Sequence, residues 1–189
     1  MIVEGKQKIW ADYQKDIPDD HYFYVRSCIR QSFFPASEVT FLDITRNKLG
    51  KDFYESAYHT TCGGIAYHSD SIPQETAMTI IARQFALMHE CGYDNYVCSC
   101  ITSFGCYTET LETWHEFPEL EAKIRQYLWD SCKKEFAKPK YLAHASDIIY
   151  KFRHEIAKQA KYKLVNVKTG KPLKVVEHIG CHYSKMFPS

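Results

Sequence analysis

The chain has 189 residues, 45% hydrophobic and 25% charged, and its 24 Lys and Arg nearly balance its 23 Asp and Glu. This composition is typical of a globular protein and argues against a basic nucleic-acid-binding surface. Without a secretory signal or the roughly 18 apolar residues of a membrane span, we expect a cytoplasmic protein. In a reducing compartment, its eight cysteines are better suited to metal ligation, thiol chemistry or burial than to disulfides.

The first half of the chain begins with a strand pattern. His21–Cys28 is rich in aromatic and β-branched residues, which predicts a buried strand with Cys28 at its carboxyl end. Pro35–Leu49 has a helical pattern that stops before a glycine. Asp52–Tyr58 is a weaker second strand. The paired glycines of Cys62-Gly-Gly64 then predict a turn whose backbone approaches a ligand closely.

The second half alternates helices and strands in the same way. Pro73–Cys91 carries apolar residues at helical spacing and predicts a helix ended by the next glycine. Asp94–Cys100 reads as a strand, and Ser103 opens a helical stretch that runs to Phe136. Tyr141–Lys161 predicts an amphipathic helix. After a turn at residues 169–172, the strand Leu173–Ile179 leads to Cys181.

Strands that alternate with helices predict an α/β fold with a small parallel sheet and flanking helices. Ligands of such sheets bind at the carboxyl ends of the strands. Three predicted strands lead to a cysteine there, at Cys28, Cys100 and Cys181. Because iron-sulfur clusters use several thiolates from distant segments, this pattern favours iron-sulfur or thiol redox chemistry.

Four motifs carry a family resemblance, and they read Tyr24-Val-Arg-Ser-Cys28, Thr61-Cys-Gly63, Gly92-Tyr-Asp94 and Cys100-Ile-Thr-Ser-Phe-Gly105. They resemble the cysteine-rich CCG-domain family, which is typified by the B component of heterodisulfide reductase and the matching component of some succinate and fumarate reductases. The family repeats one motif twice, and residues 175–182 resemble the start of the second copy. The resemblance implies an N-terminal arm (1–20), a first CCG-like domain (21–165) and an incomplete second one (173–189).

The family resemblance also implies a function. It points to an electron-transfer subunit of a multi-subunit oxidoreductase of the heterodisulfide-reductase type, with an iron-sulfur subunit and a flavoprotein subunit as partners. Through these partners the chain would lie peripherally on the inner membrane face. The family's cofactor is a [4Fe-4S] cluster of non-cubane type. The substrate is left open among heterodisulfide, fumarate or succinate, and sulfur compounds.

Two family cysteines are replaced in the chain, by Thr61 and Ser103. The resemblance carries over Cys28, Cys62 and Cys100 as ligands, so the cluster site is degenerate and one ligand short of the usual four. Cys98 or Cys106 is the candidate fourth ligand, and Cys106 lies one helical turn after Ser103. A histidine, His59 or His68, is the alternative.

The remaining roles follow from the same resemblance. Thr61, Gly63, Gly64 and Ser103 are expected to donate hydrogen bonds to the cluster sulfurs, and Cys181 is the expected ligand of the second domain. We interpret Cys91 and Cys132 as buried helix residues. The histidines predicted to lie in helices are interpreted as ordinary surface or core residues; they are His89, His115, His144 and His154.

Two alternatives to a cluster protein remain open. The chain could be a scaffold that has lost its cluster and docks a neighbouring electron carrier or anchors the complex. It could also be a metal-free thiol protein in which Cys98 or Cys100 exchanges disulfides with Cys106, which needs thiols within bonding geometry.

Overall fold

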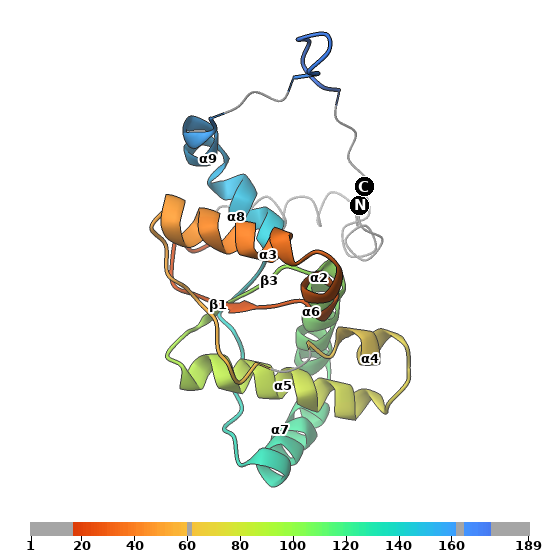
Figure 1. The fold of residues 1–189 in the computed structure, drawn as a ribbon. Coiled ribbons are helices and arrows are strands. Elements are labelled where there is room, and N and C mark those ends of the chain that lie inside the picture. Colours follow the sequence, from red (N-terminus) through yellow and green to blue (C-terminus); the bar gives the residue numbers. More distant parts are fainter. Residues whose placement is uncertain (1–16, 60–61, 162–164, 175–189) are drawn as a thin grey trace, which may run out of the picture.

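A computed structural model describes residues 17–59, 62–161 and 165–174. Within them, four short strands form one parallel sheet in the order β2-β1-β3-β4 (Figure 1). The strands are β1 (Tyr22–Val25), β2 (Phe53–Tyr54), β3 (Asn95–Cys98) and β4 (Tyr141–His144). This confirms the expected α/β fold with a parallel sheet and flanking helices.

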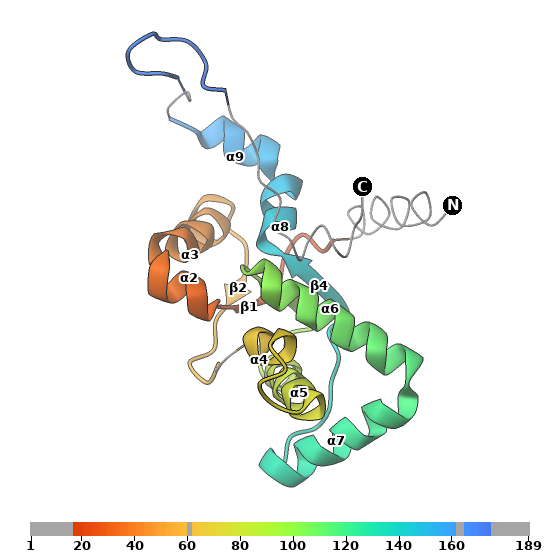
Figure 2. The same ribbon diagram turned by 90° about the vertical axis from the view of Figure 1, so that its right-hand side faces the viewer.

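Helices cover both faces of the sheet (Figures 1 and 2). One face packs against α3 and its π-helical continuation η1, together with α8, and the other packs against α5 and α6, on which α7 packs in turn. The helices are α2 (Cys28–Phe33), α3 (Pro35–Leu42), η1 (Asp43–Lys48), α4 (Gly64–His68), α5 (Gln74–Glu90), α6 (Ile101–Glu116), α7 (Pro118–Cys132), α8 (Ala145–Lys151) and α9 (Arg153–Gln159).

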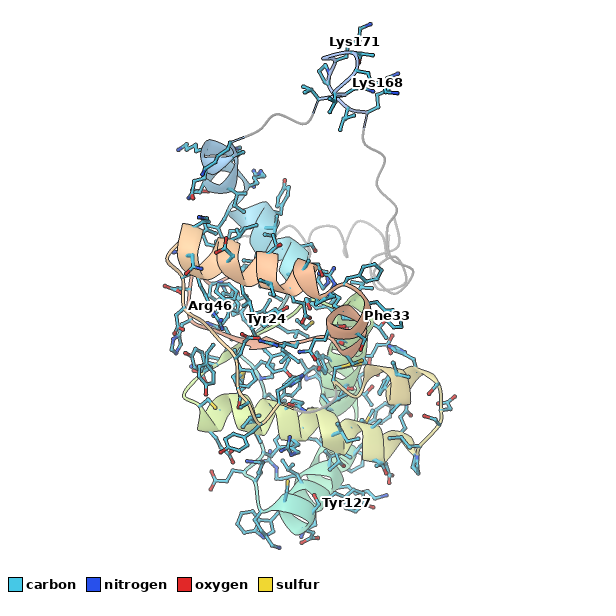
Figure 3. All side chains as sticks on the ribbon, viewed as in Figure 1. Tyr24, Phe33, Arg46, Tyr127, Lys168 and Lys171 are labelled. Atoms are coloured by element: carbon cyan, nitrogen blue, oxygen red, sulfur yellow. The ribbon has the colours of Figure 1, made fainter. Side chains whose placement is uncertain are left out.

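The central strand β1 shows why the sheet needs two layers of helices. Its side chains alternate between the faces, so that Tyr22 and Tyr24 lie in the α3 layer and Phe23 and Val25 in the α5 layer. All four are at most 1% exposed. Tyr24 stacks on Phe41 of α3 with ring centroids 5.3 Å apart (Figure 3). A strand buried on both faces gives the continuous apolar run seen in the sequence.

The helix predicted at Pro73–Cys91 is confirmed as α5. Its apolar stripe is buried, and Phe85 contacts the rings of Tyr96 and Tyr107 edge-on at 5.0 and 5.6 Å. Gly92 follows it with a positive φ of 82°, the left-handed conformation that commonly ends a helix. The helix predicted at Pro35–Leu49 is confirmed as α3 and η1.

Two predicted helical stretches were wrong in their extent. The stretch Ser103–Phe136 is two helices, because Pro118 cannot continue α6 and starts α7 instead. The stretch Tyr141–Lys161 begins with the strand β4, and its helical spacing holds only from Ala145 onward. A strand of four residues is too short to show a period of its own.

The predicted strand boundaries also differ from the structure. β1 and β3 end at Val25 and Cys98, so Cys28 and Cys100 lie in the helix starts that follow the strands. β2 has only two residues. Leu173 lies in no strand, and residues 175–179 of that predicted strand lie outside the described residues, as does Cys181. The predicted domain boundaries at 1–20, 21–165 and 173–189 remain predictions.

In the described part of the chain, no helix combines the length and the apolar character that crossing a membrane requires.

Candidate functional site

The order of the strands places a topological switch point between β1 and β3. The chain leaves β1 into α2 and α3 on one face of the sheet, and leaves β3 into α6 on the other. At such a switch point the two following helix starts diverge, which opens a ligand site at the carboxyl ends of the strands. Val25 pairs with Cys98 in the register, so the two segments that follow begin side by side.

Each of three predicted ligands lies at the start of a helix. Cys28 is the first residue of α2, Cys100 is the N-cap of α6, and Cys62 precedes Gly63, the N-cap of α4. The first backbone N–H groups of a helix have no partner within the helix and favour a negative charge nearby. The thiolate, the form of cysteine that binds metals, carries such a charge.

The structure brings the thiols of Cys28, Cys62 and Cys100 into one neighbourhood. Burial raises the pKa of Cys62, and negative charge on Cys28 or Cys100 raises it further. The hydroxyl of Ser103 and the N–H of Gly64 act in the opposite direction by hydrogen bonding to the sulfur. The three cysteines thus come together from segments 34 to 38 residues apart in the sequence.

Cys100 is surrounded by hydrogen-bond donors that stabilise its thiolate form. Burial acts to raise its pKa, but hydrogen bonds from the N–H and hydroxyl of Ser103, the hydroxyl of Ser27 and the N–H of Thr102 outweigh it. The pKa of Cys100 therefore lies below its ordinary value. The Ser103 oxygen is buried and lacks a hydrogen-bond partner of good geometry in the described part of the chain, although it lies close enough to the Cys62 and Cys100 thiols to lower their pKa values.

The two candidate fourth ligands are buried behind this group. Cys106 is 0% exposed and its thiol donates a hydrogen bond of 3.1 Å to the carbonyl of Ser103, one turn earlier in α6. Cys98 is 1% exposed, with its sulfur 3.9 Å from the carbonyl oxygens of Cys100 and Ala143. Burial raises the pKa of both thiols well above the ordinary value. Both must lose a proton to become ligands.

The glycine pair allows α4 to approach α6 closely. Gly63 has a positive φ of 77°, which favours glycine. A Cβ on Gly64 would lie 3.4 Å from the sulfur of Cys106, the Cα of Ser103 and the carbonyl of Thr102. The sequence predicted a close approach here, and the structure places it against α6. Thr61 lies outside the described residues.

The histidine alternatives are less favourable. The ring nitrogens of His59 lie 3.1 Å from Gln84 Oε1 and from the carbonyl of Arg26, so both are already engaged. His68 ends α4 with its ring edge-on to Tyr67. Each cysteine in the described residues is a free thiol, which leaves no disulfide between Cys98 or Cys100 and Cys106.

The donor set fits an iron-sulfur cluster in part. Three thiols converge, and N–H and hydroxyl groups surround them as they do around cluster sulfurs. Across residues 17–59, 62–161 and 165–174, however, no three His, Cys, Asp or Glu side chains are grouped to hold a single metal ion. The fit to a cluster therefore rests on the three thiols and the hydrogen-bond donors around them.

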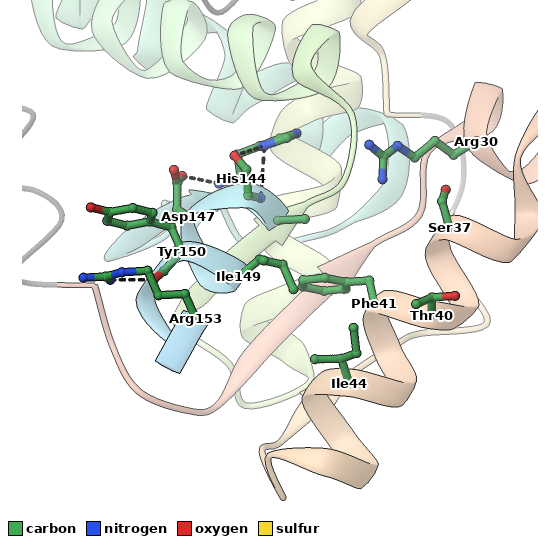
Figure 4. A pocket seen from close by; sticks show the side chains of 12 residues that line it. Arg30, Ser37, Thr40, Phe41, Ile44, His144, Asp147, Ile149, Tyr150 and Arg153 are labelled. Carbon is green, nitrogen blue, oxygen red and sulfur yellow. Dashed lines mark hydrogen bonds between the residues drawn. The ribbon is translucent and has the colours of Figure 1, made fainter. Parts of the chain in front are cut away.

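A cleft of about 650 Å³ lies between α3 and α8 (Figure 4). Phe41 and Ile149 face each other across it, and Arg30 stands at one end. His144 ends β4, not a helix as predicted, and burial lowers its pKa to about 4. Asp147 caps α8 by accepting a 3.0 Å hydrogen bond from the His144 N–H, and burial raises its pKa to about 6.

Sequence reasoning missed the hydroxyl of Ser27 and the N–H of Thr102 at the thiols. Ser27 had a usable signal, because a serine directly before a helix is a common N-cap and its oxygen does cap α2, accepting from Arg30 N at 3.3 Å. Thr102 acts through its backbone, which no residue type signals. Cys91 and Cys132, interpreted as buried helix residues, are half-buried at the ends of α5 and α7.

Comparison with known proteins finds no family model that matches the chain. The chain is 25% identical over 179 residues to the B component of a ferredoxin:CoB-CoM heterodisulfide reductase from Methanosarcina acetivorans. The match covers 91% of this chain but 55% of that protein, so the chain spans a little over half the length of its relative. The chain is therefore similar to the heterodisulfide reductase B component over most of its length, which confirms the resemblance stated for its cysteine motifs.

Proposed function

We propose that the chain is an electron-transferring subunit of an oxidoreductase complex of the heterodisulfide-reductase type. The observation that carries this proposal is the convergence of Cys28, Cys62 and Cys100 at the carboxyl ends of the strands. The relationship to a component of a heterodisulfide reductase supports it. A subunit of such a complex would meet an iron-sulfur subunit and a flavoprotein subunit, and would lie in the cytoplasm or at the inner membrane face.

An iron-sulfur cluster is the cofactor that the proposal requires, and a [4Fe-4S] cluster fits the family. When bound, it would supply one-electron transfer, with its potential set by burial and by hydrogen bonds to sulfur. Cys28, Cys62 and Cys100 would hold it, with Cys106 or Cys98 as the fourth ligand. Cys106 is the better candidate, because its sulfur packs against Gly64 beside Cys62, whereas Cys98 lies within strand β3.

The chain's own groups would prepare the site before the cluster binds. The Ser103 hydroxyl and the N–H groups of Gly64 and Thr102 stabilise negative sulfur, which lowers the pKa of Cys100 and offsets part of the rise that burial causes in the pKa of Cys62. The buried aromatic layer beneath them, including Tyr96 and Tyr107, keeps water away from one side. Both effects favour ligand sulfur over solvated thiol.

A cluster-free scaffold is the second candidate, and one observation favours it. Thr61 and Ser103 replace two family cysteines, and the two candidate fourth thiols are buried with raised pKa values. If the cluster has been lost, the domain would serve to dock a partner that carries electrons. The choice of substrate among heterodisulfide, fumarate or succinate, and sulfur compounds belongs to the partners in either case.

The deciding experiment measures iron and acid-labile sulfide per chain in protein purified without oxygen, within its complex. About four irons per chain supports the cluster, and Cys62→Ala is then expected to abolish loading. Cys132→Ala is the matched control, since that thiol is half-buried in α7 and donates to Leu128 O instead. Iron-free chains in complexes whose other subunits keep their iron would contradict the cluster proposal and favour the scaffold.

A further inference from the structure

Glu38 occupies an unusual place for a charged residue. It lies in the first turn of α3, where an acidic residue is normally exposed, yet it is only 4% exposed. Burying a carboxyl group is costly unless hydrogen bonds replace the lost water. The groups that replace the water therefore show what Glu38 holds in place.

Two hydrogen bonds converge on one oxygen of Glu38. The N–H of Ser27 donates to Oε1 at 2.7 Å, and the hydroxyl of Ser99 donates to the same atom at 2.7 Å. Ser27 directly precedes Cys28, and Ser99 directly precedes Cys100. A single side chain from a third segment thus ties together the two segments that carry these cysteines.

The tie extends to the sulfur of Cys100. Ser27, whose N–H is held by Glu38, directs its hydroxyl to the Cys100 thiol. Glu38 therefore acts on Cys100 from two sides, through Ser99 in the same segment and through Ser27 from the opposite helix start. Because the β1–β3 register aligns Val25 with Cys98, the sheet sets the segments side by side and Glu38 fixes them beyond the last strand pair.

We propose that Glu38 is a positioning residue that holds the Cys28 and Cys100 segments at the separation the cluster site requires. The role rests on the proposed function where it concerns the cluster, whereas the tie itself is a property of the protein alone. A residue that orients a metal ligand without touching the metal typically lowers metal affinity by roughly 10- to 100-fold when it is removed. A residue that merely anchored α3 to the sheet would lack this effect.

The test compares Glu38→Ala with Glu38→Gln, whose amide oxygen keeps the shape and one acceptor. Thr45→Ala is the control, because Thr45 is buried in η1 directly after α3 and its hydroxyl donates within the α3–η1 segment, to Phe41 O at 2.9 Å and Leu42 O at 3.3 Å. It weakens the same helical segment without touching the tie. All three variants are first checked for cooperative unfolding.

In cluster-free protein, hydrogen exchange at the Ser27 amide and alkylation rates of Cys28 and Cys100 at one pH are measured. Glu38→Ala is expected to speed hydrogen exchange at the Ser27 amide about tenfold and to change the alkylation rates of both cysteines. Glu38→Gln is expected to have a smaller effect on both measurements. Thr45→Ala is expected to change neither. Unchanged exchange and alkylation in Glu38→Ala would overturn the proposal, whether or not the wild-type chain binds iron.

In loaded protein, the rate of cluster loss to a chelator and the electron paramagnetic resonance spectrum are measured. Glu38→Ala is expected to lose its cluster roughly 10- to 100-fold faster and to shift the spectrum of the remaining clusters, with Glu38→Gln restoring most of both. Equal loss in Glu38→Ala and Thr45→Ala would show a purely structural role. If the wild-type protein contained no iron, the proposed function would be contradicted. The role of Glu38 in joining the two segments would then be tested by the hydrogen-exchange and alkylation measurements on cluster-free protein.

Discussion

The amino ends of the strands and their carboxyl ends are held by different chemistry. At the amino ends, His21 places one ring nitrogen 2.9 Å from Asp52 and the other 3.1 Å from the carbonyl of Gly92, and Tyr93 donates to Asp52 at 2.9 Å. At the carboxyl ends, a buried hydroxyl, that of Ser103, faces thiols. Polar groups at the first end satisfy one another, whereas at the second end some of them, such as the Ser103 hydroxyl, face sulfur.

This contrast separates stability from function within one sheet. Asp52 links β2 to the turn after α5, so the amino end closes the fold without any added group. The carboxyl end, in contrast, leaves thiols and donors that gain most from a bound ligand. Substitutions at the amino end are therefore expected to change stability but not iron content, and those at the carboxyl end to change the thiols and iron content. Four experiments can measure this difference.

The largest effect on stability is expected from Asp52→Ala. It removes the acceptor shared by His21 and Tyr93 and should lower the free energy of unfolding by about 1–3 kcal/mol, measured by urea denaturation. Iron per chain should stay at the wild-type level. Iron loss at an unchanged unfolding free energy would mean that the two ends are not separate in the way described.

A smaller effect, matched at the two ends, is expected from alanine at two glycines. Gly63 and Gly92 have φ values of 77° and 82°, and each alanine should cost about 1–2 kcal/mol because a Cβ disfavours this conformation. Gly63→Ala should in addition reduce iron loading, since it moves the backbone next to Cys62, and Gly92→Ala should not. Equal iron contents in the two variants would contradict the separation between the two ends of the sheet.

At the carboxyl end, cluster-free protein should show two thiols with different titrations. Hydrogen bonds lower the pKa of Cys100, whereas burial raises that of Cys62. Alkylation by iodoacetamide should therefore reach half its maximal rate at a lower pH for Cys100, as followed by mass spectrometry. Ser103→Ala should move both midpoints upward. A lower midpoint for Cys62 than for Cys100 would contradict the described hydrogen bonds.

The smallest effect is expected from His21 at the amino end. Its hydrogen bond to the Gly92 carbonyl, with a further contribution from Asp52, raises its pKa. Its stabilisation is therefore full below the unfolded pKa of about 6.5 and is lost as the pH rises through the higher folded pKa.

His21→Gln should thus destabilise the protein at low pH only, by less than about 1 kcal/mol because the pair is exposed. Thermal unfolding across pH 5 to 9 measures the difference, and His115→Gln, at an exposed position of α6, is the control. A difference that grows with pH would have the wrong sign.

The sequence was sufficient for the parallel α/β fold and for strands β1 and β3, because both depend on local patterns. Buried parallel strands appear in the sequence as runs of aromatic and β-branched residues, and Gly63 and Gly92 mark a turn and a helix end. The proline at position 118 was a sequence signal for the break between α6 and α7, but the helical pattern on both sides of it concealed the break. β4 had none, since four residues leave too little pattern to separate a strand from the helix after it.

The contacts around the thiols were beyond sequence reasoning for a different reason. Glu38 looks like an ordinary first-turn acidic residue, and its partners lie 11 and 61 residues away. Only the packing of α3 against β1 and β3 brings them together. Local pattern thus predicts which residues carry the chemistry, and tertiary packing decides how they are held.

The pairing of β1 with β3 has a consequence for protein engineering. Cys28 and Cys100 follow adjacent strands in a register that aligns Val25 with Cys98, and a slip of one residue would shift one cysteine by about 3.3 Å. The loops that connect these strands can vary in length without changing that spacing. Two neighbouring parallel strands with their helix starts, together with the Glu38 tie, therefore form a unit that a designer could graft onto another parallel sheet to present two thiols at a defined separation.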